Sequence, residues 1–320
     1  MSDYVVGLDL GGTKIMTAVV DVAGHVVHKR FTLSEVSKGP DAVLERMAGA
    51  IHETVKGAGL AMTDVAAIGI GSPGPLDQDE GIVTDSPNMP GWKNVRVKDR
   101  IAKATGRRVF LDNDGNVGTL AEQAFGAGRG VDNLIGLFLG TGIGGGVIIN
   151  GRLWHGFSKQ AGELGHVVVD VNGPRCGCGQ RGCIEALASR QAMCRQIAEA
   201  VRGGRKSAIT ETDPIQIRTT HLVDALAVGD DLVREVMTRA MEYLGVAMAS
   251  MAHVVSPEMF VIGGGVIDAL TDEMLELAAE AARKRALRLV MDNVKVVRAQ
   301  LREDAPVLGA AALARQGLAT

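Results

Sequence analysis

Two glycine-rich turns, each between short apolar segments, constrain the fold of this chain more than any other feature of its sequence. The first turn joins segments 5–10 and 15–20, and the second, at 140–146, joins segments 134–139 and 147–149. Short apolar runs interrupted by glycines are typical of β-hairpins. Because the order of strand, Gly/Thr turn and strand occurs in both halves of the chain, we predict a duplicated core with two related lobes that face each other.

The segments around these hairpins alternate between strand-like and helical patterns, which indicates a layered α/β fold. Further strands are expected at 65–70, 109–111 and 260–262. Helices are expected at 41–56, 99–105, 185–201, 232–252, 271–289 and 309–316. The polar segment 203–220 is expected to be an exposed loop.

The composition excludes several classes of protein. The 320 residues carry a formal net charge of −3, so the chain lacks the basic balance of a nucleic-acid-binding surface. No apolar run approaches the roughly 20 residues of a membrane-spanning helix. We therefore expect neither nucleic acid nor membrane as a partner, and we expect a cytoplasmic protein. At roughly 150 residues per domain, the length suggests two domains.

The first glycine turn resembles a phosphate-binding P-loop only in part. A P-loop places Lys before Ser or Thr and opens into a helix, whereas here Thr13 precedes Lys14 and a strand pattern follows. A dinucleotide-binding fingerprint also requires a helix after its glycines. Glycines at a hairpin tip instead let backbone N–H groups approach a phosphate, and the Thr13 hydroxyl is an additional donor.

The second tip, Gly-Thr-Gly at 140–142, offers the same groups, so the two tips are expected to hold one polyphosphate from both sides. Asp9 precedes the first tip and is placed to orient Mg²⁺. The glycines 263–265 follow a strand and supply a third site of close approach. The candidate nucleotide-binding residues are Asp9, Gly11, Gly12, Thr13, Lys14, Thr141, Gly142, Gly263, Gly264 and Gly265.

Three of the four cysteines crowd into one short segment. Cys176, Cys178 and Cys183 supply three thiolates, and His166 lies upstream. Four nitrogen and sulfur ligands suit tetrahedral zinc, and a full set of four leaves no position for water, so we predict a structural zinc. A redox pair of cysteines is the alternative. Cys194 lies within a helical pattern and is expected to be a core thiol.

A carboxylate near the end of a buried strand is the candidate general base. Asp114 follows the strand 109–111, at the edge where α/β proteins place their ligands. Asp112 is a rival on the residues alone.

Taken together, these motifs resemble the ROK family of sugar kinases and repressors, within the actin-like (ribonuclease H-like) ATPase superfamily. The resemblance is carried by segments 9–14, 71–75, 113–116, 140–142, 163–166 and 176–185. It implies an α/β, two-lobed actin-like ATPase fold with a duplicated βββαβα core and a zinc knot. We expect a small α/β domain formed by 1–112 plus 305–320, and a large α/β domain, 113–304, that holds the zinc site and a helical part.

The resemblance also implies roles for particular residues. It selects Asp114 as the base and Asn113 as a binder of sugar hydroxyls. It implies that Glu163, His166 and Glu185 bind the anomeric side of a hexose, that His166 also ligates zinc, and that Gly74 and Asn88 approach the opposite side. The expected substrate-binding residues are Gly74, Asn88, Asn113, Asp114, Glu163, His166 and Glu185.

The implied activity is that of an ATP:hexose 6-phosphotransferase that forms glucose 6-phosphate. An acid at the position of Glu163 resembles the sequences of the glucose-phosphorylating branch of the family. The alternative activity is that of an N-acylhexosamine (N-acetylglucosamine or N-acetylmannosamine) kinase or a fructose kinase. Some relatives are repressors with an N-terminal helix-turn-helix, for which the position of Asp9 leaves no room, and a non-enzymatic sugar sensor is the less favoured hypothesis. By analogy with these relatives, a homodimer or homotetramer is expected. ATP, another nucleotide and polyphosphate remain open as the donor.

Overall fold

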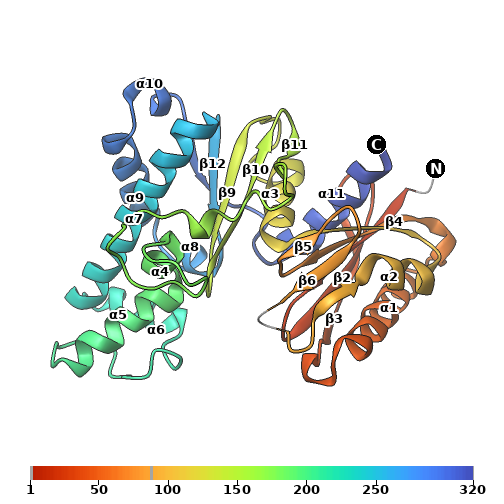
Figure 1. Cartoon of the computed structure of the whole chain (residues 1–320), viewed down its shortest axis with the longest axis horizontal. Helices are drawn as coiled ribbons and strands as arrows, with labels where there is room; N and C mark the ends of the chain where they lie inside the picture. Colours follow the sequence, from red (N-terminus) through yellow and green to blue (C-terminus); the bar gives the residue numbers. More distant parts are fainter. Residues whose placement is uncertain (1–2, 87–88, 320) are drawn as a thin grey trace.

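The computed structural model describes residues 3–86 and 89–319 and contains two five-stranded mixed sheets (Figure 1). The strands of the first sheet are β1 (Tyr4–Leu10), β2 (Lys14–Val20), β3 (Val26–Leu33), β4 (Val65–Ser72) and β8 (Arg108–Asn113). They lie in the order β3-β2-β1-β4-β8. The first three strands are antiparallel, whereas β4 is parallel to β1 and to β8.

The second sheet repeats this arrangement. Its strands are β9 (Leu134–Leu139), β10 (Ile143–Ile149), β11 (Arg152–Leu153), β12 (Met259–Gly263) and β13 (Lys295–Arg298). They lie in the order β11-β10-β9-β12-β13, which corresponds strand for strand to the order of the first sheet. The predicted duplication is therefore confirmed. A small antiparallel sheet follows β4 and consists of β5 (Leu76–Asp77), β6 (Ile82–Asp85) and β7 (Lys93–Arg96).

Helices cover both faces of each large sheet. On the first sheet, α1 (Pro40–Gly57) and α2 (Val97–Thr105) cover one face. A larger group of helices covers one face of the second sheet with an apolar core. This group consists of α4 (Ile184–Ala188), α5 (Arg190–Arg202), α6 (Thr219–Ala227), α7 (Asp231–Val255), α8 (Gly265–Ala269), α9 (Asp272–Arg285) and α10 (Arg288–Met291). Short 3₁₀ turns occur at Val36–Lys38 (η1), Met62–Asp64 (η2), Leu164–His166 (η3) and Arg302–Asp304 (η4).

Two helices lie between the sheets. α3 (Asp114–Phe125) packs on β9 and β10, and α11 (Ala305–Ala319) packs on β1, β4 and α3 (Figure 1). A Cβ at Gly7 would lie 1.9 Å from the Val307 carbonyl oxygen, and one at Gly69 would lie 1.7 Å from that of Ala310. Glycines in β1 and β4 thus allow α11 to lie directly on the sheet backbone.

A buried carboxylate connects α3 to the segment that leads into α11. Glu122 is fully buried, and its Oε1 atom accepts hydrogen bonds from the backbone N–H groups of Gln300 and Leu301. Its Oε2 atom accepts one from the N–H of Ala127. A buried charge needs partners of this kind, so the position of the crossing segment is set by a side chain of α3.

The second turn is shorter than the sequence predicts, because β10 begins at Ile143 rather than at 147. The glycines 144–146 pair with β9 instead of forming a turn. A Cβ at Gly145 would lie 2.4 Å from the carbonyl oxygen of Gly136, so glycine here reflects close packing within a strand.

Two expected helices are divided. The segment 185–201 breaks at Ser189, whose Oγ accepts a hydrogen bond from the N–H of Ala192 and caps α5. The segment 271–289 contains α9 and the start of α10, which are separated at Ala286. The segment 203–220 is irregular only until α6 begins at Thr219.

The prediction that 203–220 is an exposed loop is wrong in part. Ile209 and Ile217 are 3% and 0% exposed and pack in the core beneath the second sheet. Cys194, the expected core thiol, is fully buried and donates a hydrogen bond to the carbonyl of Ile217. In the described part of the chain, every helix is too short or too polar to cross a membrane.

Candidate active site

A cleft of about 990 Å³ opens between elements of the two halves. The predicted site residues that line it are Gly74, Asn113, Asp114, Gly142, Glu163, His166, Cys178, Glu185, Gly264 and Gly265. The predicted residues outside its lining are Asp9, Gly11, Gly12, Thr13, Lys14, Thr141, Cys176, Cys183 and Gly263. Asn88 lies outside the described residues.

Asp114 is the first residue of α3 and follows β8 directly. Its side chain is accessible to the cleft, although surrounding protein shields it from bulk water. This shielding raises the pKa of the Asp114 carboxyl, the hydrogen bond from the Gly115 N–H lowers it, and the nearby charge of Glu163 raises it again. A carboxylate with a raised pKa accepts a proton more readily, which suits a general base.

Asp9 lies close enough to Asp114 for their charges to interact. Burial, then the charge of Asp114, raises the pKa of Asp9 to about 7, and Lys14 opposes this shift. Two carboxyl groups held together near a cleft form an environment that favours a divalent cation.

The first tip is held by its own sheet. The Gly11 N–H donates to the Lys14 carbonyl at 3.0 Å, and the Ser34 N–H donates to the Thr13 carbonyl at 3.1 Å. Thr13 is exposed between the two strands, and Lys14, the first residue of β2, is exposed as well.

The second tip has a turn bond of its own, from the Gly140 N–H to the Gly142 carbonyl at 2.9 Å, and it is also held from outside its sheet by α4 and the start of α5. The backbone N–H of Arg190 donates to the Gly140 carbonyl, and its Nη2 atom lies 3.0 Å from the Thr141 Oγ1 atom. The Glu185 Oε2 atom accepts a hydrogen bond from the Ile143 N–H at 3.0 Å. Arg190 is a functional candidate that sequence reasoning missed, because no motif marks a helix N-terminus that approaches a distant turn.

The far end of the cleft contains residues from several distant segments. Gly264 has φ +92°, and a Cβ there would lie 2.5 Å from the carbonyl oxygen of Leu139. Burial raises the pKa of Asp268, and the charges of Arg302 and Arg298 oppose this. The lining residues that sequence reasoning missed at this end are Phe138, Asp268, Ala299, Arg302, Glu303 and Pro306. These residues lack a shared sequence motif.

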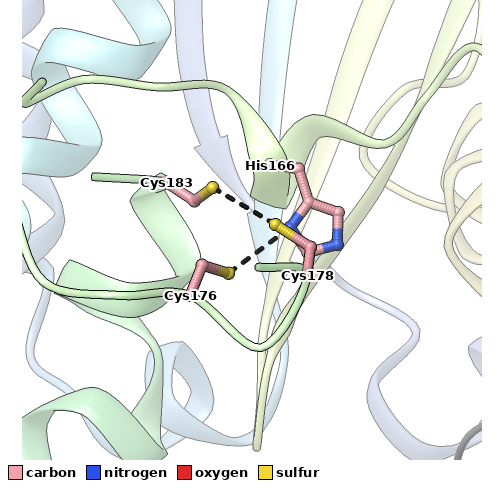
Figure 2. A group of neighbouring side chains, drawn as sticks. All are labelled: His166, Cys176, Cys178 and Cys183. Atoms are coloured by element: carbon pink, nitrogen blue, oxygen red, sulfur yellow. Dashed lines mark hydrogen bonds between the residues drawn. The ribbon is translucent and has the colours of Figure 1, made fainter. Parts of the chain in front are cut away.

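Four predicted metal ligands come together at the other end of the cleft (Figure 2). One ligand atom from each of His166, Cys176, Cys178 and Cys183 lies within 4.8 Å of the others. The Cys178 and Cys183 sulfurs are 3.7 Å apart, as are the Cys176 sulfur and the His166 Nδ1 atom. Burial raises the pKa of Cys183 to about 12. Three sulfurs and one nitrogen at these distances fit a tetrahedral zinc ion.

Tight turns make this cluster possible. Gly179 and Gly182 have φ values of +93° and +71°. A Cβ at Gly182 would lie 1.5 Å from the carbonyl oxygen of Asp170, so only glycine fits there. The Cys176 thiol donates toward the Glu185 Oε1 atom at 3.8 Å, which connects the cluster to the second tip.

Asp112, the rival base, lies outside the cleft lining. Its side chain is 1% exposed and accepts hydrogen bonds from the Asn113 N–H, the Asn116 Nδ2 atom and the His155 Nε2 atom. With its oxygens occupied, Asp112 supports the residues beside it and is not placed to take a proton from a ligand.

Comparison with known proteins gives the family. The model of the ROK family matches residues 5–317. The chain is 39% identical to a glucokinase of Thermotoga maritima over 97% of each chain. It is similar to the crystal structure of a ROK hexokinase from Thermus thermophilus (TM-score 0.85, 35% identity, 99% of each chain). It is also similar to a ROK family glucokinase from Streptomyces griseus in complex with glucose and AMPPNP (TM-score 0.79, 31% identity, 98% and 100% of the two chains). This chain, with the duplicated fold and the motifs described above, belongs to the ROK family.

Proposed function

We propose that this protein is an ATP-dependent hexose kinase, and specifically a glucokinase. The observation that carries the proposal is Asp114, a shielded carboxylate in the lining of a cleft between two duplicated lobes. The full-length similarity to the Thermotoga maritima glucokinase supports glucose as the acceptor.

The sugar binds at the end of the cleft that holds Asn113, Asp114, Glu163, His166 and Glu185. Carboxylates and amides are suited to this because each accepts hydrogen bonds from sugar hydroxyls, at about 1.5–3 kcal/mol per charged bond. Asp114 accepts the proton of the 6-hydroxyl as that oxygen bonds to the γ-phosphorus and the bond to the leaving ADP oxygen breaks. Burial, together with the nearby charge of Glu163, keeps the pKa of Asp114 raised, which assists this transfer.

The nucleotide binds with its phosphates between the two glycine tips and its nucleoside toward Gly264 and Gly265. The backbone N–H groups of the tips and the Thr13 and Thr141 hydroxyls supply donors for phosphate oxygens. Asp9 is the residue that would hold Mg²⁺, which supplies charge neutralisation of the phosphates when it is bound.

The cluster of His166, Cys176, Cys178 and Cys183 would hold a structural zinc. Four protein ligands close a tetrahedral shell, so the ion supports the fold and takes no part in the reaction. Its place beside Glu185 links metal binding to the shape of the sugar site.

We further propose a small domain of residues 1–112 plus 305–320 and a large domain of residues 113–304. The two sheets support this division, because β8 ends at Asn113 and α11 packs on the first sheet. A cytoplasmic homodimer or homotetramer remains our proposal for the assembled protein, by analogy with the family.

A coupled assay across glucose, mannose, fructose, N-acetylglucosamine and N-acetylmannosamine, with ATP or polyphosphate as donor, tests the function. We expect glucose with ATP to give the highest kcat/KM. Another preferred sugar would replace glucokinase with the corresponding kinase, and no phosphorylation of any sugar would refute kinase activity.

Asp114→Asn tests the assignment of the base. We expect kcat to fall by about 10²–10⁴-fold, with the Kd for glucose changed by less than about threefold. Asp231→Asn is the matched control, because Asp231 is also the first residue of a helix but is exposed far from the cleft lining. An Asp114→Asn enzyme that keeps most of its turnover would remove Asp114 from this role.

A further inference from the structure

The segment 155–162 joins the two halves of the molecule beside the sugar end of the cleft. It follows β11 of the second sheet and leads directly into Glu163. Gln160 donates to the Leu76 carbonyl at 2.8 Å, and Gln78 donates back to the Lys159 carbonyl at 2.9 Å. The segment that presents a sugar-binding acid is thus fastened to the other half of the molecule.

Two ion pairs connect the same segment to the first half, and they differ in burial. Lys159 and Asp79 are 3.3 Å apart, with 44% and 70% of their side chains exposed. His155 and Asp112 are 2.7 Å apart, with only 26% and 1% exposed. An exposed pair contributes little because water screens it, whereas a buried carboxylate that loses its partner is costly.

Asp112 connects this contact to the proposed base. Its Oδ1 atom accepts from the N–H of Asn113, which precedes Asp114, and from the Nδ2 atom of Asn116 on α3. Its Oδ2 atom accepts from His155. The buried Asp112 side chain therefore orients the start of α3. Its bond to His155 also connects the start of α3 to the segment that leads into Glu163.

The charge of His155 follows from its surroundings. The hydrogen bond to Asp112 raises the pKa of His155, burial opposes this, and the charges of Asp112 and Asp79 raise the pKa while that of Lys159 lowers it. The net direction is upward, so the imidazole stays protonated to a higher pH than an ordinary histidine.

We propose that His155 is a positioning residue for the sugar, which holds Glu163 and the Asn113–Asp114 pair at a fixed separation through its ion pair with Asp112. Loss of the pair lets the two sides of the sugar site move apart. The nucleotide tips do not depend on this contact, so sugar binding is affected far more than nucleotide binding.

Titration calorimetry with glucose and separately with AMPPNP, on folded protein, tests the proposal. His155→Ala should weaken glucose binding by about tenfold or more and change AMPPNP binding by less than about twofold. Asp79→Asn is the matched control, because it breaks the exposed ion pair between the same two segments, and its glucose affinity should stay within about twofold of wild type.

His155→Gln separates hydrogen bonding from charge. Its amide can still donate to Asp112 but carries no charge, so its glucose affinity should match that of the wild type above the raised pKa of His155 and be weaker than that of the wild type below it. In the wild type, glucose affinity should fall as pH rises through the raised pKa of His155, and the Gln variant should lack that part of the pH dependence. This variant also keeps the question answerable if His155→Ala does not fold.

Glucose affinity within about twofold of wild type in His155→Ala, or an equal loss for glucose and AMPPNP, would overturn the proposal. So would a His155→Gln variant with the pH dependence of the wild type. The inference rests on the proposed kinase function, and the two fail differently. A wild-type protein that neither binds nor phosphorylates a hexose contradicts the function, whereas an active wild type with an unaffected His155→Ala variant contradicts the inference alone.

Discussion

The β1–β2 and β9–β10 hairpins occupy equivalent places in the two sheets but are held in different ways. The tip of the first hairpin is fixed by Lys14 and Ser34, from its own strand and from the segment after β3. The tip of the second has a turn bond of its own and is fixed in addition by Arg190 and Glu185, which belong to helices beneath the sheet. Glu185 also accepts from the thiol of Cys176, one of the four proposed zinc ligands.

This difference shows how two copies of the same hairpin in a duplicated fold can acquire different roles. The backbone of the two copies is alike, so both tips can present N–H groups to phosphate. The second tip is tied to the cluster of His166, Cys176, Cys178 and Cys183, whereas the first is preceded by an acid whose pKa is raised to about 7. We therefore expect substitutions in the first hairpin to affect the reaction. Changes to the residues that hold the second hairpin should affect local structure as well.

The largest effect should come from Asp9→Asn in the first hairpin. Removal of the charge that we propose to hold Mg²⁺ beside the phosphates should lower kcat by about 10²–10³-fold. The variant should nevertheless be the more stable protein at pH 8. Asp9 has a folded-state pKa of about 7 against an ordinary 3.8, so wild-type stability falls as pH rises between these values.

Turnover assays and melting temperatures from pH 5 to 8 check this. A variant with more than half of wild-type kcat would mean that the acid before the first tip has no catalytic role. A variant less stable than wild type at pH 8 would contradict the raised pKa of Asp9.

Removal of metal should act on the second hairpin and spare the first. After chelation, or in Cys183→Ser, we expect the free energy of unfolding to fall by about 3 kcal/mol or more, and glucose to bind about tenfold more weakly. Hydrogen exchange at the Ile143 amide should accelerate, because its acceptor Glu185 lies beside the cluster. Exchange at the Gly11 amide should not change, and added Zn²⁺ should restore the chelated protein but not the variant.

A protein that contains no metal as purified and is unaffected by chelators would refute the zinc proposal. Equal acceleration of hydrogen exchange at both tips would show that the two hairpins are coupled. It would contradict the expectation that only the second hairpin depends on the metal.

The smallest effect should come from Arg190→Ala. Without its side chain the Thr141 hydroxyl loses a donor that fixes its rotamer, so the KM for ATP should rise by about three- to tenfold with little change in the KM for glucose. Arg202→Ala is the control, since Arg202 lies at the other end of α5 and donates to the Ala198 carbonyl within that helix. A change confined to glucose would place Arg190 with the sugar site instead of the second tip.

The sequence predicts the parts of the site whose residues are close together along the chain. The cysteine cluster is one example, because its turns require glycine at Gly179 and Gly182. The position of Asp114 after a strand is another, since the structure places it at the end of β8 and in the cleft. Both depend on local geometry, which local sequence determines.

Helix α3 and the nucleotide end of the cleft depend on contacts that sequence does not display. Buried polar residues such as Asn116, Thr119 and Glu122 give α3 an uncertain helical pattern, and Glu122 finds its partners near Gln300 and Leu301. Phe138, Asp268 and Arg302 meet only when the chain crosses between the sheets. Long-range packing, not local propensity, determines these regions.

The direct packing of α11 on β1 has a consequence for the order in which the protein folds. β1 begins at Tyr4 and α11 at Ala305, so this strand is synthesised long before the helix that covers one of its faces. Contacts so distant in sequence form slowly, and exposed strands are prone to association in the meantime. We expect the second sheet and its helices to form first, and the first sheet to be completed only when α11 docks on it.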